Sequence, residues 1–152
     1  FDVDLANGVS LRESDTRAHG AEVVTAQTDL CIVGLSVCYD VRFPELYRGL
    51  AKHGSQVIFV PSAFTAYTGQ AHWQALLRAR AIENQAYIVA PDQFGKHAKS
   101  FEAYGHSMIV DPWGKILAEL ADGPGVITAE IDLEYLASVR AELPALNHRR
   151  LV

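Results

Sequence analysis

The chain has 152 residues, of which 49% are apolar, so it is long enough to bury the core of about one domain. Its net charge of −5 excludes a basic surface for nucleic acid, and no lysine and arginine cluster is dense enough for a membrane surface. No apolar run approaches the roughly 18 residues of a spanning helix, and the opening residues carry no signal-peptide pattern. We therefore expect neither nucleic acid nor a membrane among its partners.

The cysteine content favours a reducing environment. Cys31 and Cys38 are the two cysteines, and a small secreted scaffold held together by disulfides would use more of them. We therefore expect a cytoplasmic protein. Neither cysteine belongs to a CxxC pair, and the six histidines show no HExxH or similar ligand spacing. The sequence thus predicts no structural zinc site.

The first predicted elements are a strand followed by a helix. Residues 30–37 form a near-continuous apolar run, which is typical of a strand buried on both faces. Beyond this run the apolar period changes to that of a helix, with one buried face made of Phe43, Leu46, Tyr47 and Leu50. Pro44 is tolerated in the first turn of this helix, and Gly54 ends it.

The middle of the chain repeats this alternation of strand and helix. Residues 57–60 predict a second strand, and residues 86–90 predict a third. Between them, residues 70–85 predict a helix whose narrow apolar stripe consists of Ala75, Ala79, Ile82 and Ala86. Strands that alternate with helices indicate a largely parallel sheet.

The last third predicts a hairpin, a strand and a final helix. Residues 106–110 and 115–119 flank a turn at residues 111–114, with proline and glycine at its favoured positions. Residues 125–131 predict a further strand, and Asp132 can cap a helix that ends before Pro144. The hairpin adds an antiparallel portion to the sheet, so the predicted class is α/β.

Cys38 lies where the first predicted strand gives way to the first helix. Reacting groups of open α/β sheets collect at the carboxyl ends of strands, and a helix N-terminus favours a thiolate and a developing oxyanion. Cysteine is also among the most frequently buried residue types. A buried core cysteine is therefore the alternative for Cys38, and Cys31 keeps that interpretation because it lies inside the apolar run.

Three long segments carry a family resemblance. They read GLSVCYDVRFPEL, then VPSAFTAYTGQAHWQALLRARAIENQAYIVAP, then YGHSMIVDPWGKILAE. In this order they resemble the nitrilase (carbon–nitrogen hydrolase) superfamily, and the match runs from Phe1 to Arg150. Within it they look most like the amidases that act on deaminated glutathione and on omega-amides of 2-oxo acids. The resemblance implies part of an α-β-β-α sandwich, with mixed sheets flanked by helices.

The resemblance also implies a mechanism that uses Glu, Lys and Cys without metal or cofactor. Cys38 matches the nucleophile of the family, which would attack an amide carbonyl and form a thioester that water hydrolyses. The backbone N–H of Tyr39 matches one oxyanion donor. Glu13 matches a second carboxylate that positions the lysine and the substrate. Phe64 and Thr65 follow the second predicted strand and are expected to shape the acyl site.

The sequence departs from the family pattern at two catalytic positions. In the family, the general-base Glu and the catalytic Lys both precede the segment equivalent to Phe1, so no residue here can be assigned to either. General acid–base catalysis alone contributes about 10²–10⁴-fold. We therefore expect residues 1–152 to be the C-terminal portion of a single carbon–nitrogen hydrolase domain, nearly inactive alone and with an apolar sheet face uncovered.

Other polar residues receive mainly structural interpretations. We expect His72 and Trp73 to pack as a pair on a helix, and we expect His106 to lie in the core. A partly buried polar network is expected to brace the second helix, and its expected members are Arg78, Arg80, Glu83 and Asn84. The resemblance suggests that residues 144–150 form an arm that reaches a neighbouring subunit, in a homodimer or higher homo-oligomer.

The leading functional hypothesis is an amidase for small carboxylated amides, acting on a small-molecule substrate. One alternative is a cysteine hydrolase in which His72 or His106 is the base for Cys38. A second alternative is a catalytically incomplete fragment, or a subunit that serves assembly only. Hydrolysis of N-carbamoyl amino acids or of nitriles are further alternatives within the family.

Overall fold

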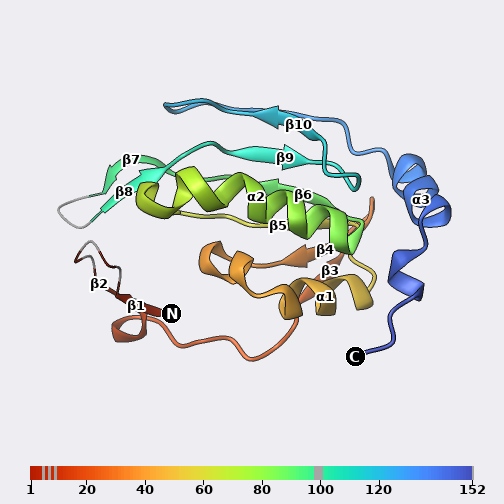
Figure 1. The fold of residues 1–152 in the computed structure, drawn as a ribbon, viewed down its shortest axis with the longest axis horizontal. Helices are drawn as coiled ribbons and strands as arrows, with labels where there is room; N and C mark the ends of the chain where they lie inside the picture. The colour runs from red at the N-terminus through yellow and green to blue at the C-terminus, as the bar shows by residue number, and fades with distance from the viewer. Residues whose placement is uncertain (5, 7, 9, 98–100, 152) are drawn as a thin grey trace.

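The computed structural model describes residues 1–4, 6, 8, 10–97 and 101–151, and its largest element is a six-stranded sheet (Figure 1). The strand order in this sheet is β10-β9-β6-β5-β4-β3, and two hairpins, β1-β2 and β7-β8, lie outside it. The strands are β1 (Asp2–Asp4), β2 (Ser10–Arg12), β3 (Thr25–Gln27), β4 (Ile32–Leu35), β5 (Val57–Phe59), β6 (Tyr87–Ala90), β7 (Phe94–His97), β8 (Phe101–Tyr104), β9 (Met108–Val110) and β10 (Ile116–Glu119). The helices are α1 (Pro44–Lys52), α2 (Ala66–Asn84) and α3 (Leu133–Glu142), with shorter 3₁₀ turns η1 (Glu13–Asp15), η2 (Cys38–Arg42) and η3 (Ala145–Asn147).

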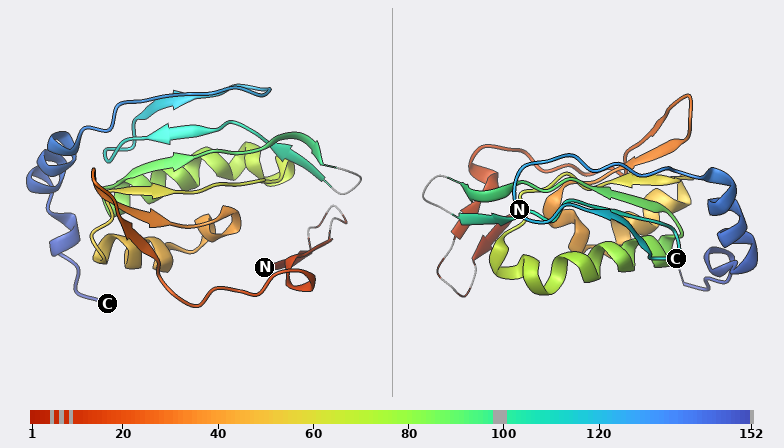
Figure 2. Two further views of the ribbon diagram at one scale, coloured as in Figure 1. Left: turned by 180° about the vertical axis from the view of Figure 1, so that it is seen from behind. Right: turned by 90° about the horizontal axis from the view of Figure 1, so that it is seen from above.

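The centre of the sheet is parallel and its edges are antiparallel. β4 pairs with β5 and β5 with β6 in parallel, whereas β3, β9 and β10 join in antiparallel fashion. Because crossovers between parallel strands are right-handed and both run in the same direction, α1 and α2 lie on the same face (Figure 2). This mixed sheet flanked by helices confirms the predicted α/β class.

The first helix has the predicted end and most of the predicted buried face, but Phe43 precedes the helix as its N-cap residue and is 39% exposed. In α1, Tyr47 and Leu50 are fully buried and Leu46 packs against the same core. Pro44 occupies the first turn, where its missing N–H costs nothing. Gly54 follows the helix with φ of +86°, a left-handed conformation that glycine adopts without strain.

The second helix buries a different face from the predicted one. The prediction that the alanine stripe forms the buried face was wrong, because Ala75 and Ala79 are exposed and Ile82 is 49% exposed. The buried face of α2 consists of Gly69, Trp73, Leu77, Arg80, Ala81 and Asn84. Trp73 and Leu77 bring far more apolar area to the core than alanines can, so this face stabilises the contact with the sheet.

The sheet has one covered and one partly open face. On the helix side, Ile58 and Ile88 pack in the main core with α1 and α2. On the other face, Leu136 of α3 covers Val57 and Tyr87, but Leu35 is 44% and Phe59 is 37% exposed. The prediction that residues 30–37 are buried on both faces was therefore wrong, because Leu30 and Val37, at the two ends of the run, are 84% and 60% exposed. Val33 of β4, in contrast, packs against the cluster that contains Leu136.

In the last third of the chain, one predicted element is confirmed and another prediction is wrong. The turn between β9 and β10 is as predicted, since the Asp111 carboxylate accepts hydrogen bonds from the amides of Trp113 and Lys115 at 2.9 and 2.8 Å. Residues 125–131 are extended but form no strand, and Val126 is 88% exposed. An apolar run becomes a strand only where a neighbour pairs with its backbone, and the sheet as described ends at β10.

Asp132 caps α3 as predicted, because its Oδ1 accepts a hydrogen bond from the amide of Tyr135 at 2.8 Å. We expect Asp132→Ala to lower the free energy of unfolding by about 1 kcal/mol, the usual cost of losing an N-cap. Urea unfolding measures this loss. Asp132→Asn keeps a capping oxygen and is the control, and an equal loss in both variants would contradict the capping role.

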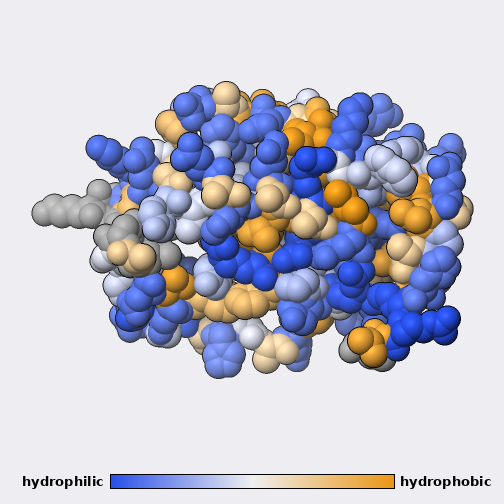
Figure 3. Space-filling view, in the orientation of Figure 1, coloured by the Kyte–Doolittle hydropathy of each residue, from blue (hydrophilic) through white to orange (hydrophobic). Residues whose placement is uncertain are grey.

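The surface that carries the helices is largely hydrophilic with scattered apolar residues (Figure 3). Within residues 1–4, 6, 8, 10–97 and 101–151, no helix combines the length and apolar character needed to cross a membrane.

After α3 the chain forms the turn η3, and Arg149 donates a hydrogen bond to the carbonyl of Leu146 at 3.0 Å.

Candidate active site

Three neighbouring parallel strands end at the same edge of the sheet. Cys38 follows β4, Ser62 follows β5 and Asp92 follows β6. The pairing continues past the strands, because the Cys38 amide donates to the carbonyl of Pro61 at 3.0 Å and the Ser62 amide to that of Pro91 at 2.9 Å. Backbone hydrogen bonds therefore hold these three side chains next to one another.

A pocket of about 780 Å³ opens at this edge. Its wall includes every residue that the sequence singled out for the site, namely Cys38, Glu13, Tyr39, Phe64 and Thr65. The pocket brings together segments that are up to 100 positions apart in the chain, from Phe1 to Phe101. The tertiary structure thus gathers all the predicted site residues around one cavity.

Cys38 has a strained backbone. Its φ is +48°, in the left-handed region that non-glycine residues rarely adopt. The Val37 amide donates to the Asp40 carboxylate at 2.8 Å and closes the sharp turn around Cys38. The turn η2 begins at Cys38 and α1 begins only at Pro44, so the expected α-helix does not start at the cysteine. Such strain at an exposed turn is typical of a nucleophile elbow.

The thiol environment raises the pKa of Cys38. Burial is the main cause, and the negative charges of Asp92 and Glu13 raise it further, while hydrogen bonds from the Ala63 amide and the Ser62 hydroxyl lower it. On balance, the described neighbours of Cys38 therefore do not favour its thiolate. A cation or a general base must act on this thiol to make it a strong nucleophile.

Glu13 lies at the rim of the pocket. It is the first residue of η1, and its Oε2 lies 2.8 Å from the nitrogen of Phe1. Its side chain is 53% exposed. The ring of Phe1 in turn lies 5.0 Å from that of Tyr39 and 5.1 Å from that of Phe43, centroid to centroid. The opening residues thus cover the side of the pocket next to Cys38.

Arg42 is a pocket residue that the sequence did not single out. Its guanidinium lies over the rings of Tyr39 and Phe64, at 5.3 and 5.0 Å from their centroids. Its Nη1 lies 3.2 Å from Nδ1 of His72. Arg42 comes four residues after Cys38 in the same turn, so its place next to the reactive thiol follows from the short spacing.

Phe64 and Thr65 link the pocket to the core. Phe64 is almost fully buried, and its ring centroid lies 5.0 Å from that of Trp73. Thr65 is the N-cap residue of α2, and its hydroxyl lies 2.9 Å from that of Thr68. Phe64 therefore belongs mainly to the core and presents only part of its surface to the pocket, whereas Thr65 and Thr68 add hydroxyl groups to the wall.

Asp92 is the second site residue that sequence reasoning missed. Its Oδ1 accepts a hydrogen bond from the Phe64 amide at 2.8 Å. Burial raises the pKa of Asp92 to about 7, although the hydrogen bond from the Phe64 amide acts in the opposite direction. Its position just past the carboxyl end of a parallel strand was the available signal.

The two histidines of the alternative Cys/His mechanism lie outside the pocket wall. His72 is exposed and contacts Arg42, and His106 pairs with Glu119 at 2.8 Å. Trp73, next to His72, is fully buried and donates a hydrogen bond to the carbonyl of His106 at 2.9 Å. In the pocket that the described residues form, neither His72 nor His106 is therefore placed as a base for Cys38.

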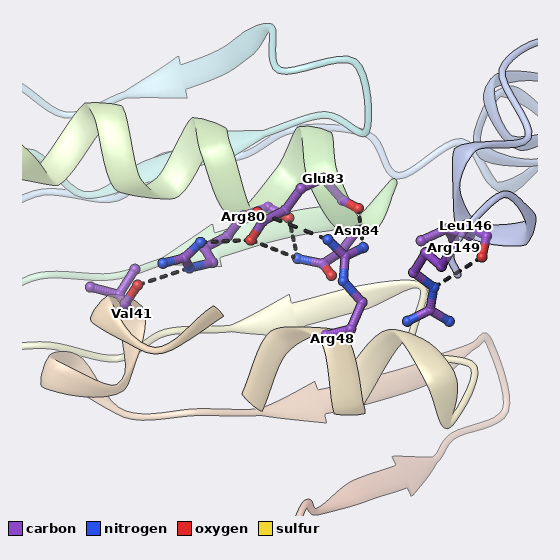
Figure 4. A network of polar contacts seen from close by, with 7 residues as sticks. All are labelled: Val41, Arg48, Arg80, Glu83, Asn84, Leu146 and Arg149. Atoms are coloured by element: carbon purple, nitrogen blue, oxygen red, sulfur yellow. Dashed lines mark hydrogen bonds and ion pairs between the residues drawn. The ribbon is translucent and has the colours of Figure 1, made fainter. Parts of the chain in front are cut away.

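The polar network on α2 ties this helix to the turn that carries Cys38 (Figure 4). Arg80 donates to the Val41 carbonyl at 2.9 Å and to the Glu83 carboxylate at 2.6 Å, and Asn84 donates to the Arg80 carbonyl at 2.9 Å. Arg48 of α1 also donates to the Glu83 carbonyl. Arg78, expected in the network, instead donates to the Gly114 carbonyl at 2.8 Å.

Among the residues that the structure describes, no group of three or more histidine, cysteine, aspartate or glutamate side chains is arranged to hold a metal ion. The titratable groups of the pocket wall are instead a thiol, carboxylates, a phenol and guanidinium groups. The arrangement of a half-buried thiol, a tight turn and a largely apolar pocket with a few polar groups is suited to acyl transfer through a covalent intermediate.

The similarity of this chain to known proteins agrees with that chemistry. The family model for carbon-nitrogen hydrolase matches residues 2–141. The deaminated glutathione amidase of Synechocystis sp. is 50% identical over 154 residues, and the match covers 100% of this chain and 57% of the relative. The chain thus spans about half the length of the curated relatives that it matches.

Two solved structures show the same fold. The crystal structure of the C. elegans NitFhit protein superposes with a TM-score of 0.91 at 48% identity, over 99% of this chain and 37% of that one. An amidase from Nesterenkonia sp., solved with acrylamide added at its active site cysteine, gives a TM-score of 0.71 at 32% identity, over 87% of this chain and 52% of that one. On these grounds the chain belongs to the carbon-nitrogen hydrolase family.

Proposed function

We propose that this protein hydrolyses the C–N bond of a small amide that bears a carboxylate, with Cys38 as the nucleophile. The observation that carries the proposal is the strained turn that holds Cys38 against a pocket of about 780 Å³. The Synechocystis relative is named deaminated glutathione amidase, and the Nesterenkonia amidase has an active site cysteine. The first name supports amide hydrolysis, and the second supports a reactive cysteine.

The proposed reaction proceeds through a cysteinyl thioester. The Cys38 sulfur, once deprotonated, attacks the amide carbon and forms a C–S bond, which places the negative charge on the carbonyl oxygen. The C–N bond then breaks, and the nitrogen leaves with a proton as ammonia or an amine. Water attacks the thioester, releases the acid and returns the proton to the sulfur. The sum is amide plus water to acid plus ammonia or amine.

The groups around Cys38 have distinct proposed roles. The backbone amide of Tyr39 is proposed to donate to the oxyanion, and Glu13 to orient the substrate. Because burial and two carboxylates raise the pKa of the thiol, deprotonation requires a general base and a cation. No lysine lines the pocket as the structure describes it. In the family pattern, a glutamate and a lysine supply these two groups.

Arg42 is the proposed partner of the substrate carboxylate. Its guanidinium lines the pocket and lies over two aromatic rings, which orient it without neutralising its charge. A planar guanidinium binds a carboxylate through two parallel hydrogen bonds. The side chain therefore favours amides that carry a carboxylate over those that do not.

Ammonia release from a panel of amides tests this proposal. We expect Arg42→Met to raise KM about tenfold to 100-fold for a carboxylated amide, the effect of losing one charged hydrogen-bonding partner. The KM for the matched amide without the carboxylate should change by less than about threefold. Arg42→Lys keeps the charge but not the bidentate geometry and should be intermediate. Equal loss on both amides would contradict the role of Arg42, and no ammonia from any amide would contradict the function.

A further inference from the structure

Asp92 is a carboxyl group at the site whose role the proposed mechanism leaves unassigned. It follows the carboxyl end of β6, and Ser62 lies beside it in a parallel bridge that extends the pairing of β5 with β6. The Gln93 amide donates to the Ser62 carbonyl at 3.0 Å, which fixes the two segments against each other. Asp92 therefore has a defined position relative to residues 61–65.

The carboxyl group makes one short contact to this neighbouring segment. Its Oδ1 accepts the hydrogen bond from the Phe64 amide at 2.8 Å. Ser107 holds the backbone of Asp92 from the other side, because its hydroxyl lies 2.9 Å from the Asp92 amide nitrogen and 3.2 Å from the Asp92 carbonyl oxygen. With its backbone held in this way, Asp92 acts as a fixed anchor for the Phe64 amide.

The segment that Asp92 anchors is also the segment that faces the thiol. The Cys38 amide donates to the Pro61 carbonyl at 3.0 Å, and hydrogen bonding from Ala63 and Ser62 acts on the pKa of the thiol. Residues 61–65 thus contact both the backbone and the side chain of Cys38. Without the anchor, the Phe64 amide would lose its partner, and the hydrogen bonding of Ala63 and Ser62 to the thiol would loosen.

The second carboxyl oxygen has a different environment. Oδ2 is shielded from solvent and finds no hydrogen-bond partner among the described residues. The charge of Asp92 acts on Cys38, and the charge of His106 acts on Asp92. The other charged groups of the pocket wall are Arg12, Glu13, Arg17 and Arg42. A polar oxygen that is unpaired and shielded from solvent lowers the stability of the folded state. The Asp92 carboxyl group therefore holds the Phe64 amide at some cost in stability.

We propose that Asp92 is a positioning residue for the nucleophile, which holds residues 61–65 against Cys38 through its hydrogen bond with the Phe64 amide. The inference rests on the proposed role of Cys38. It adds that the orientation of the thiol depends on a carboxyl group that touches neither the sulfur nor the amide carbon. The required feature is the acceptor oxygen of the side chain, and not its negative charge.

The variants Asp92→Asn and Asp92→Ala distinguish the role of Asp92 as a hydrogen-bond acceptor from the role of its negative charge. Asparagine keeps an oxygen for the Phe64 amide, and alanine removes it. We expect hydrogen exchange of the Phe64 amide to accelerate at least about tenfold in Asp92→Ala and to stay near the wild-type rate in Asp92→Asn. With the full protein, kcat should fall about 10²-fold in Asp92→Ala, the usual effect of a misplaced reacting group, with KM changed less than about threefold, and Asp92→Asn should restore most of the rate.

The effect of the Asp92 charge on the Cys38 thiol is measured separately, by alkylating Cys38 with iodoacetamide at a series of pH values. Because a nearby negative charge disfavours the thiolate, both variants should shift the alkylation midpoint to lower pH, on the order of one pH unit. Asp29→Asn, in the turn before β4 at the opposite edge of the sheet, makes the same chemical change and should shift nothing. Thermal unfolding of each variant shows whether the fold is retained.

The result that overturns the proposal is a Phe64 amide that exchanges in Asp92→Ala as slowly as in the wild type. A loss of kcat in Asp92→Asn as large as in Asp92→Ala would overturn it equally, because the charge and not the acceptor would then matter. Hydrogen exchange and alkylation need no turnover. They therefore test Asp92 even if the protein releases no ammonia, a result that would contradict only the proposed function.

Discussion

Cys38→Ala is expected to lower the rate of ammonia release by about 10⁴-fold or more, the size of effect seen when a nucleophile is removed. Alanine lacks the sulfur that forms the thioester, so no covalent intermediate can form. It keeps the Cβ, and the backbone at φ +48° therefore remains as strained as before. The fold should change little, and the free energy of unfolding should change by about 1 kcal/mol or less.

Cys31→Ala is the matched control for this experiment. Cys31 is half-buried and packs with Val33 in the smaller core cluster, seven residues before Cys38 in the same part of the chain. Its loss should leave kcat within about twofold of the wild type while costing about 1 kcal/mol of stability. If Cys38→Ala kept more than a tenth of the wild-type rate, Cys38 would not be the nucleophile. Mass spectrometry after brief exposure to substrate would detect the acyl group on Cys38 directly.

Arg80→Ala is expected to lower the free energy of unfolding by about 3–5 kcal/mol, because it breaks a mostly buried ion pair and leaves its partners unpaired. The Arg80 side chain is 7% exposed and the Glu83 side chain 31% exposed. The Val41 carbonyl and the Glu83 carboxylate would both lose their short contact with the guanidinium. The guanidinium also lies 5.4 Å from the centroid of the Tyr47 ring, a contact that alanine cannot replace.

Arg78→Ala on the same helix is the control for Arg80. Arg78 is exposed and makes one hydrogen bond, to the Gly114 carbonyl at 2.8 Å. Its loss should cost about 1 kcal/mol or less. Urea unfolding of the two variants measures the difference, and a loss in Arg80→Ala no larger than that in Arg78→Ala would contradict the bracing role. Because Val41 lies in the turn that begins at Cys38, alkylation of Cys38 should also become faster in Arg80→Ala.

The features that depend on neighbouring residues were predicted correctly. Gly54 adopts the left-handed conformation that ends α1, and Asp132 caps α3 through the amide three residues later. The turn at residues 111–114 follows from its proline and glycine. In each case the decisive contacts lie within a few residues, so the local sequence contains the whole physical cause.

The features that depend on distant partners were predicted less well. Arg80 is buried because the Val41 carbonyl, 39 positions earlier, satisfies its guanidinium. The alanine stripe was a reasonable prediction only on the assumption that charged residues face the solvent. Residues 125–131 have the composition of a strand, but no partner strand lies beside them in the described sheet.

The sequence by itself determined the α/β class and, through the family motifs, which residues are expected at the site, with Cys38 as the expected nucleophile. Only the tertiary structure decided that Asp92 and Arg42 share the pocket with Cys38, and that the thiol is surrounded by groups that raise its pKa. The reason is that pKa and positioning depend on burial and on charges from several strands. These meet only when β4, β5 and β6 align in parallel and end at one edge of the sheet.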